Sequence, residues 1–172
     1  MSNWDSYFLD VCNVVAKNSK CLSRQIGAIL VRDKRIISEG YNGPPQGVPH
    51  CGERWQCDDG LKKEWAVHTS YPIAASNVCP RQLLGYKSGE GLEWCIAGHA
   101  ERNALISAAY NGIATKGATL YMDCGIPCTP CLVEIINAGI TEIVVAKLTY
   151  YDKMAKWICD HSDLKVRTYV FG

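Results

Sequence analysis

Two short stretches of the chain carry residues whose types and spacing suit metal binding. In "AGHAERNALI", His99 and Glu101 lie two residues apart where an apolar helical pattern begins. In "GIPCTPC", Cys128 and Cys131 lie three residues apart, so their sulfurs share one side of a first helical turn. A helix N-terminus carries partial positive charge and favours the thiolates that zinc requires. We therefore expect both stretches to open a helix and to contribute to one site.

His99, Cys128 and Cys131 would hold one zinc ion and leave its fourth position to water, as in catalytic zinc sites. Two thiolates cancel the charge of the ion, so a water bound to it benefits from a nearby base. Glu101 is too close in sequence to His99 to be an obvious fourth ligand. It is well placed to take a proton from that water and pass it to a substrate. A structural zinc site or a redox dithiol is the alternative, but neither needs Glu101.

The composition excludes several classes of protein. The 172 residues fit one domain, and the net charge of +1 lacks the basic excess typical of proteins that bind polynucleotides. A nucleotide monomer remains compatible with it. The N-terminus does not resemble a secretory signal, and no apolar run is long enough to cross a bilayer. We expect a cytoplasmic protein, in which the ten cysteines stay reduced and point to metal rather than disulfides.

The hydrophobic periodicity predicts an α/β protein. It indicates a helix near residues 4–15 and a hairpin of strands at 26–31 and 35–40. From about residue 99, helices (99–111, 128–138, 153–159) alternate with strands (118–123, 142–147, 165–171), which predicts a sheet covered on both faces. From Tyr41 to about Gly98 the periodicity disappears, and five of the seven prolines fall there. We expect a long irregular insert that a metal clamp ties to the core.

Several motifs together resemble the deoxycytidylate deaminases of the cytidine-deaminase superfamily. H-x-E followed by P-C-x-x-C is a signature of zinc nucleobase deaminases. "HAERNAL", "PCTPC" and "QIGAILVRDKRIISEGYNGPPQG" (Gln25 to Gly47) resemble the family's motifs. The resemblance implies one deaminase domain over residues 1–172, with an insert at about 44–98. It also implies a three-layer α-β-α fold with a five-stranded mixed sheet, helices on both faces and a zinc-stapled insert.

The same resemblance implies an activity, the zinc-dependent hydrolytic deamination of dCMP to dUMP and ammonia, which supplies dUMP for thymidylate synthesis. Glu101 would protonate N3 of the base and then the leaving amine. Asn42 would contact the deoxyribose or phosphate, and we add Ala100 and Tyr151 as substrate contacts. Tyr151 follows a strand at the edge where open α/β sheets bind ligands, although aromatic packing in a turn is the alternative. Members are commonly hexamers, activated by dCTP and inhibited by dTTP, and Mg²⁺ would accompany a regulatory nucleotide.

A second, structural zinc ion occurs in some members of the family. The matching residues here are Cys21, Cys51, Cys79 and Cys95. Four thiolates suit a closed tetrahedral zinc, which would offset the entropy cost of ordering the insert. Cys57 and His50 are rival ligands, and the alternative is that these cysteines are merely buried.

Two departures from the family pattern and two rival functions remain. Arg102 stands where the family more often has leucine or glutamine, and Cys124 is an extra thiol that we expect to be a small buried residue.

One rival function is that of a deaminase of the same fold acting on cytidine, dCTP, guanine, a riboflavin precursor or a tRNA base. The other is a non-catalytic zinc module that binds nucleotides.

Overall fold

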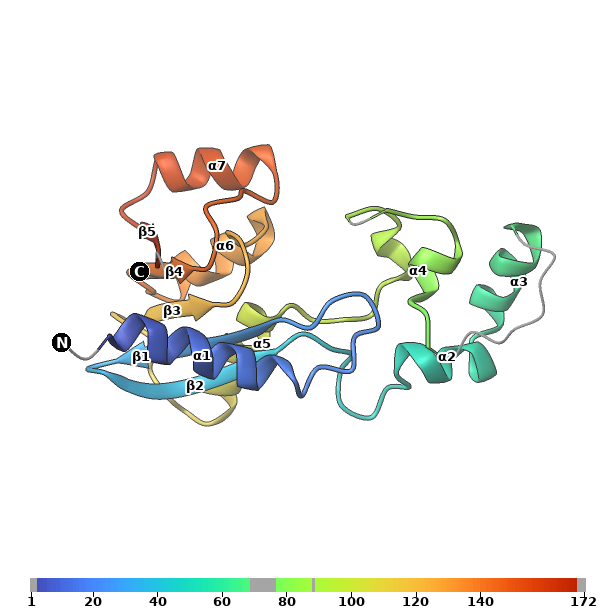
Figure 1. Ribbon diagram of the computed structural model, residues 1–172, viewed down its shortest axis with the longest axis horizontal. Helices are drawn as coiled ribbons and strands as arrows, with labels where there is room; N and C mark the ends of the chain where they lie inside the picture. Colours follow the sequence, from blue (N-terminus) through green and yellow to red (C-terminus); the bar gives the residue numbers. More distant parts are fainter. Residues whose placement is uncertain (1–2, 69–76, 88, 170–172) are drawn as a thin grey trace. The chain divides into compact units, whose positions relative to one another are not determined.

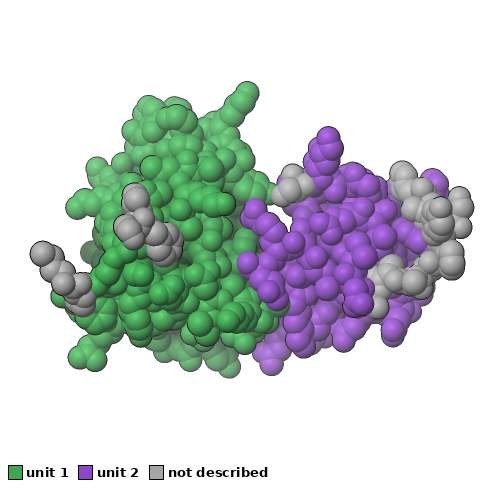
Figure 2. All heavy atoms as spheres, viewed as in Figure 1, with its two compact units in different colours: residues 1–19, 26–42, 99–172 green, residues 20–25, 43–98 purple. Residues whose placement is uncertain are grey.

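The computed structural model describes residues 3–68, 77–87 and 89–169 of the chain. They fall into two compact units (Figure 2), of which unit 1 comprises residues 1–19, 26–42 and 99–172 and unit 2 comprises 20–25 and 43–98. The prediction of one domain with an insert at about 44–98 stays a prediction. Across the described residues, no helix has the length and apolar character needed to span a membrane.

Unit 1 is built on a five-stranded sheet in the order β2-β1-β3-β4-β5 (Figure 1). Its strands are β1 (Gly27–Arg32), β2 (Arg35–Tyr41), β3 (Thr119–Met122), β4 (Glu142–Val145) and β5 (Lys165–Thr168). β1 is antiparallel to both β2 and β3, whereas β3, β4 and β5 are parallel. The predicted mixed sheet is confirmed. The last strand was expected to reach residue 171, but β5 ends at Thr168, and residues 170–172 lie outside the described part.

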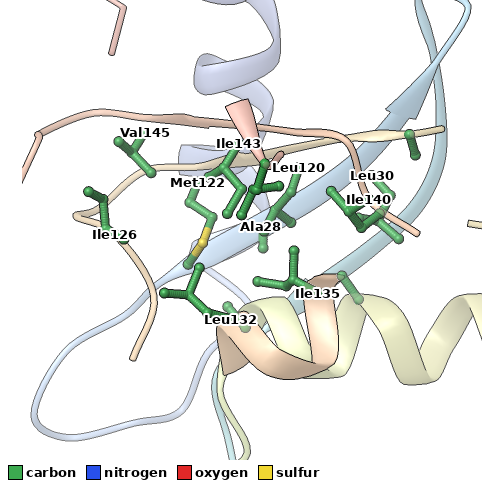
Figure 3. Close-up of a cluster of buried hydrophobic side chains, with 14 of the residues drawn as sticks. Ala28, Leu30, Leu120, Met122, Ile126, Leu132, Ile135, Ile140, Ile143 and Val145 are labelled. Carbon is green, nitrogen blue, oxygen red and sulfur yellow. The ribbon is translucent and has the colours of Figure 1, made fainter. Parts of the chain in front are cut away.

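Helices cover both faces of this sheet, as predicted. On one face, α1 (Trp4–Ala16) packs Phe8, Leu9 and Cys12 against strand residues that include Ile29 and Val144. On the other face lie α5 (Ala100–Tyr110), α6 (Thr129–Asn137) and α7 (Lys153–Asp160). Figure 3 shows side chains of α6 meeting those of the strands in this second core, which includes Ala28, Leu120, Met122, Leu132, Ile135 and Ile143. Because side chains alternate along a strand, each strand supplies both cores.

Unit 2 corrects one prediction, because the segment expected to be irregular contains helices. These are α2 (Cys51–Cys57), α3 (Asp59–His68), α4 (Pro80–Leu83) and the 3₁₀ turn η1 (Leu92–Trp94). They enclose a small core of Trp55, Leu61, Trp65 and Leu84. Helices this short leave no clear periodicity, since the pattern needs a window of about 11–18 residues.

Local capping signals for two of these helices were present in the sequence and were missed. The Glu53 carboxylate accepts the backbone N–H of His50 at 2.7 Å, where α2 begins. The Asp58 carboxylate accepts the backbone N–H of Leu61 at 2.9 Å, where α3 begins. Side-chain acceptors at a helix start satisfy backbone donors that have no partner within the helix.

A glycine in β2 sets the position of α5. A Cβ atom at Gly40 would lie 2.2 Å from the backbone nitrogen of Ala104 and 2.5 Å from the carbonyl oxygen of Ala100. Both atoms belong to the backbone of α5 and cannot move aside separately. The side-chain amide of Asn103 also donates to the carbonyl of Tyr41 at 2.8 Å. β2 and α5 therefore form one closely packed pair, and α5 begins directly after His99.

Replacing Gly40 with alanine should destabilise the protein, because the added methyl group must push β2 and α5 apart. We expect the free energy of unfolding to fall by about 1–3 kcal/mol, the usual cost of overpacking. Urea unfolding followed by circular dichroism measures it. Gly43→Ala is the matched control, because no atom lies within 4 Å of a Cβ at that position. Equal unfolding midpoints for both variants and the parent would contradict this packing.

Candidate metal centre

α5 places His99 and Glu101 at its N-terminal end. His99 is the N-cap residue, and Ala100 and Glu101 are the first two residues of the helix. Glu101 is only 4% exposed, on the face of α5 that packs against the sheet. The two-residue spacing therefore turns the imidazole and the carboxylate toward a common point, as the sequence predicted.

α6 places the two cysteines in the same way. Cys128 is its N-cap residue and Cys131 lies in its first turn, with Pro130 at a position where a missing backbone donor costs little. Both cysteines are buried. The prediction that each motif opens a helix is confirmed.

The four side chains converge, with one ligand atom from each lying within 4.8 Å of all the others. The Nδ1 atom of His99 lies 3.5 Å from Sγ of Cys128, 3.4 Å from Sγ of Cys131 and 3.6 Å from Oε1 of Glu101. Zinc binds nitrogen at about 2.1 Å and sulfur at about 2.3 Å. At a tetrahedral angle, the nitrogen and the sulfur are then about 3.5 Å apart. The nitrogen and the two sulfurs therefore fit three ligands of one tetrahedral zinc ion.

Hydrogen bonds among these side chains couple their protonation. The contact with Cys128, followed by that with Glu101, raises the pKa of His99 to about 10. Hydrogen bonds from Cys131 and His99 lower the pKa of Cys128 to about 5 against the opposing effect of burial. The hydrogen bond to Cys128 and burial raise the pKa of the Cys131 thiol above its usual range. A cation that takes the unprotonated forms of all three ligands must displace the protons they share.

An ion pair joins the two helices that carry the ligands. Arg102, in the first turn of α5, contacts Glu134 of α6 through two nitrogens, with Nε 2.9 Å from Oε2 and Nη2 2.8 Å from Oε1. Bidentate geometry of this kind fixes orientation as well as distance. Arg102, which departs from the family pattern, thus helps to hold α5 against α6. No pattern in the sequence indicates this partner, which lies 32 residues away.

The other predicted site residues of unit 1 lie in different environments. Asn42 is buried directly after β2, and its side-chain oxygen accepts the backbone N–H of Ile26 at 2.8 Å. Ala100 is buried beside His99, and Tyr151 is 47% exposed in the loop between β4 and α7. Their roles as substrate contacts stay predictions. Cys124 is partly buried against the main core, and its thiol donates to the carbonyl of Gly125 at 3.4 Å.

The four cysteines predicted to bind a second zinc all belong to unit 2. Cys51 and Cys79 are buried, Cys21 is partly buried and Cys95 is exposed. Burial raises the pKa of the Cys51 thiol, and the thiols of Cys79, Cys21 and Cys95 raise it further, so these groups lie within electrostatic range of Cys51. Among the described residues, they are not drawn together as tightly as the cluster around His99.

A groove on unit 1 is separate from the metal ligands. Its volume is about 480 Å³, and it is lined by residues of α5, of α6 and of the loop after α5, including Leu105, Ile106, Ala109 and Ile113. Arg102 and Glu134 border it, but none of the four clustered side chains does. The groove therefore offers no place for a substrate that must reach the metal centre.

Comparison with known proteins agrees with the geometry of the site. The model of the family described as "Cytidine and deoxycytidylate deaminase zinc-binding region" matches residues 2–147. The chain is 32% identical over 168 residues to a deoxycytidylate deaminase of Schizosaccharomyces pombe, an alignment that covers 98% of this chain and 44% of the relative. It is 31% identical over 160 residues to the deoxycytidylate deaminase of Enterobacteria phage T4, covering 86% of this chain and 79% of the relative. The chain thus spans less than half the length of the yeast relative.

Solved structures share the fold. The dCMP deaminase of cyanophage S-TIM5, crystallised with dCMP and dUMP, superposes with a TM-score of 0.67 at 19% identity, and the match covers 98% of each chain. At this identity the similarity shows a common fold, which agrees with the sheet order and the three layers of unit 1. With the family match over most of its length and the His-x-Glu and Cys-x-x-Cys motifs assembled at one point, this chain belongs to the cytidine and deoxycytidylate deaminase family.

Proposed function

We propose that this protein is an enzyme that catalyses the zinc-dependent hydrolytic deamination of dCMP to dUMP and ammonia. The observation that carries the proposal is the convergence of His99, Cys128 and Cys131 beside the buried carboxylate of Glu101. Three protein ligands leave one coordination position, which distinguishes a catalytic zinc site from a closed structural one. A structural site has no use for a fourth, acidic side chain at that position.

His99, Cys128 and Cys131 would hold the zinc ion, which would supply a Lewis acid that makes a water molecule more acidic. The carboxylate of Glu101 accepts the proton of that water as the oxygen attacks C4 of the cytosine ring. Glu101 then donates this proton to N3, and a second proton, from the new hydroxyl group at C4, passes through the same carboxylate to the amino group. Ammonia leaves, and the C4 carbonyl of dUMP forms.

The surroundings of Glu101 suit this proton transfer. Its side chain is almost fully buried, whereas the side chain of His99 is 44% exposed. A proton held on Glu101 is thus kept from bulk water, and the exposed side of the cluster offers an approach for a substrate. The first turn of α5 places the carboxylate 3.6 Å from Nδ1 of His99, beside the metal ligands.

Replacing Glu101 with glutamine should slow turnover strongly and leave the zinc site in place. Glutamine keeps the shape of the side chain but cannot accept a proton, and removing a general acid–base costs about 10²–10⁴-fold in rate. We expect kcat to fall by this factor, measured by ammonia release from dCMP, with zinc content and unfolding midpoint unchanged. Glu39→Gln, at an exposed position of β2, is the matched control. Turnover by Glu101→Gln at the parent rate would refute the mechanism.

We also propose dCMP as the preferred substrate, with dUMP passing to thymidylate synthesis. The relatives named deoxycytidylate deaminase and the phage enzyme crystallised with dCMP and dUMP support this choice. We further propose a hexamer that dCTP activates and dTTP inhibits, each with Mg²⁺. Exposed apolar side chains of α5 near the groove, Ile106 and Tyr110, favour association between copies.

A substrate panel tests these choices together. Ammonia release from dCMP, cytidine, dCTP and guanine should give the highest kcat/KM for dCMP. Adding Mg²⁺ with dCTP should raise turnover at low dCMP, and adding Mg²⁺ with dTTP should lower it. Light scattering on the same sample should give the mass of six chains. Faster turnover of cytidine or guanine than of dCMP would contradict the proposed substrate while leaving the zinc chemistry intact.

A second, structural zinc ion in unit 2 is part of the proposal, held by Cys21, Cys51, Cys79 and Cys95. The electrostatic coupling of these thiols around Cys51 supports it. Of the rival ligands, Cys57 is exposed and its thiol points along its own helix toward the carbonyl of Glu53 at 3.7 Å. Reduced thiolate ligands also fit the cytoplasmic location that we propose.

Metal analysis distinguishes one site from two. We expect two zinc ions per chain in the parent protein. Cys79→Ser should reduce this to one and lower the stability of unit 2, because metal binding contributes directly to folding. Cys159→Ser, at a partly buried cysteine of α7 outside both ligand sets, should retain two. A parent protein with a single zinc ion would rule out the second site.

A further inference from the structure

Helix α6 begins with a cysteine as its N-cap residue. Cys128 carries a sulfur in place of the side-chain oxygen that usually caps a helix. Its sulfur instead lies 3.5 Å from Nδ1 of His99, in the metal cluster. The backbone N–H of Thr129, the first residue of the helix, therefore needs an acceptor from elsewhere in the fold.

The carboxylate of Asp152 supplies this acceptor. Its Oδ2 accepts the backbone N–H of Thr129 at 3.0 Å, and its Oδ1 accepts the hydroxyl of Thr129 at 2.5 Å. The same Oδ1 accepts the backbone N–H of Ala155 at 2.7 Å, because Asp152 is also the N-cap residue of α7. One side chain thus joins the N-terminal ends of two helices. Its partner, Thr129, lies between Cys128 and Cys131.

The segment that carries Asp152 contacts the ligand turn, residues 125–131, at a second point. The carbonyl of Thr149 accepts the backbone N–H of Ile126 at 3.0 Å. A Cβ atom at Gly125 would lie 2.3 Å from the hydroxyl of Thr149, so the two segments are in close contact. Residues 149–152 therefore hold the ligand turn at Ile126 and at Thr129, on either side of Cys128.

The charge of Asp152 suits this position. Burial by itself would raise the pKa of Asp152, but the hydrogen bonds from Thr129 and Ala155 outweigh it and lower the pKa below its ordinary value. The side chain is then a carboxylate at neutral pH. Helix N-termini stabilise negative charge, and two of them meet here.

We infer that Asp152 is a positioning residue for the metal centre, which fixes Thr129 so that the thiols of Cys128 and Cys131 face His99. The inference rests on the zinc site of the proposed function. Partners one layer outside the ligands orient them, and their loss typically costs about 10–100-fold in metal affinity or activity. Asp152 acts through Thr129.

Variants separate this role from simple capping of α7. Asp152→Ser keeps a good N-cap residue for α7 but is too short to reach Thr129 as well. Thr129→Val removes the hydroxyl donor at nearly constant size, and Thr129→Ser restores it. Asp160→Ser is the matched control, because it also removes a carboxylate from α7. The carboxylate of Asp160 pairs with exposed Lys156 at 2.6 Å.

The readouts are the absorption bands of the cobalt-substituted protein and the rate at which zinc passes to a chelator, followed by kcat and KM for dCMP. We expect Asp152→Ser and Thr129→Val to shift the cobalt bands and to lose zinc about 10–100-fold faster. Their kcat should fall more than their KM changes. Thr129→Ser and Asp160→Ser should match the parent.

Unchanged cobalt bands and zinc loss in folded Asp152→Ser and Thr129→Val would overturn the inference. If Asp152→Ser does not fold, Thr129→Val carries the test, since it leaves the cap of α7 intact. Altered metal readouts in a chain that does not deaminate dCMP would support the positioning role and refute the proposed substrate. A parent protein that binds neither zinc nor cobalt would overturn both.

Discussion

The meeting of one imidazole and two thiols at the N-terminal ends of two helices is the constraint on which the site depends. His99 and Cys128 are both N-cap residues, so each ligand group lies where its helix offers partial positive charge. The sulfurs of Cys128 and Cys131 lie within 3.5 Å of Nδ1 of His99. Without a metal ion, these three groups compete for protons. A bound cation that takes the place of the shared protons would stabilise this arrangement of the three ligands.

Packing against the sheet positions the two helices that carry the ligands. α5 is fixed against β2 by the close approach at Gly40, and α6 packs Leu132 and Ile135 into the same core. The pair formed by Arg102 and Glu134 then joins the two helices directly. Each contact is a backbone or buried constraint, except this ion pair at the surface. The packing of the core therefore determines the positions of the metal ligands. Sites built on packed helices and strands are held more precisely than sites built on loops.

Much of unit 1 could be predicted from the sequence, because its elements are long or strongly patterned. The sheet with helices on both faces agrees with the alternation of helices and strands from about residue 99 onward. The convergence of His99, Glu101, Cys128 and Cys131 could be anticipated from their residue types and spacing, because each pair opens a helix. The helices of unit 2 were missed because they are short and are built around a cluster of tryptophan and leucine. The partner of Arg102 and the link from Asp152 to Thr129 were also missed, since each contact joins residues that are distant in sequence and the motifs give no sign of either partner.

A crystal structure of the zinc-loaded protein with an anomalous map would show whether the three ligands hold one ion. We expect a zinc peak within bonding distance of Nδ1 of His99 and of the sulfurs of Cys128 and Cys131. We also expect one coordination position that no protein atom fills, facing the carboxylate of Glu101. A peak completed by a fourth protein ligand, or ligands that stay apart with no zinc between them, would contradict this expectation.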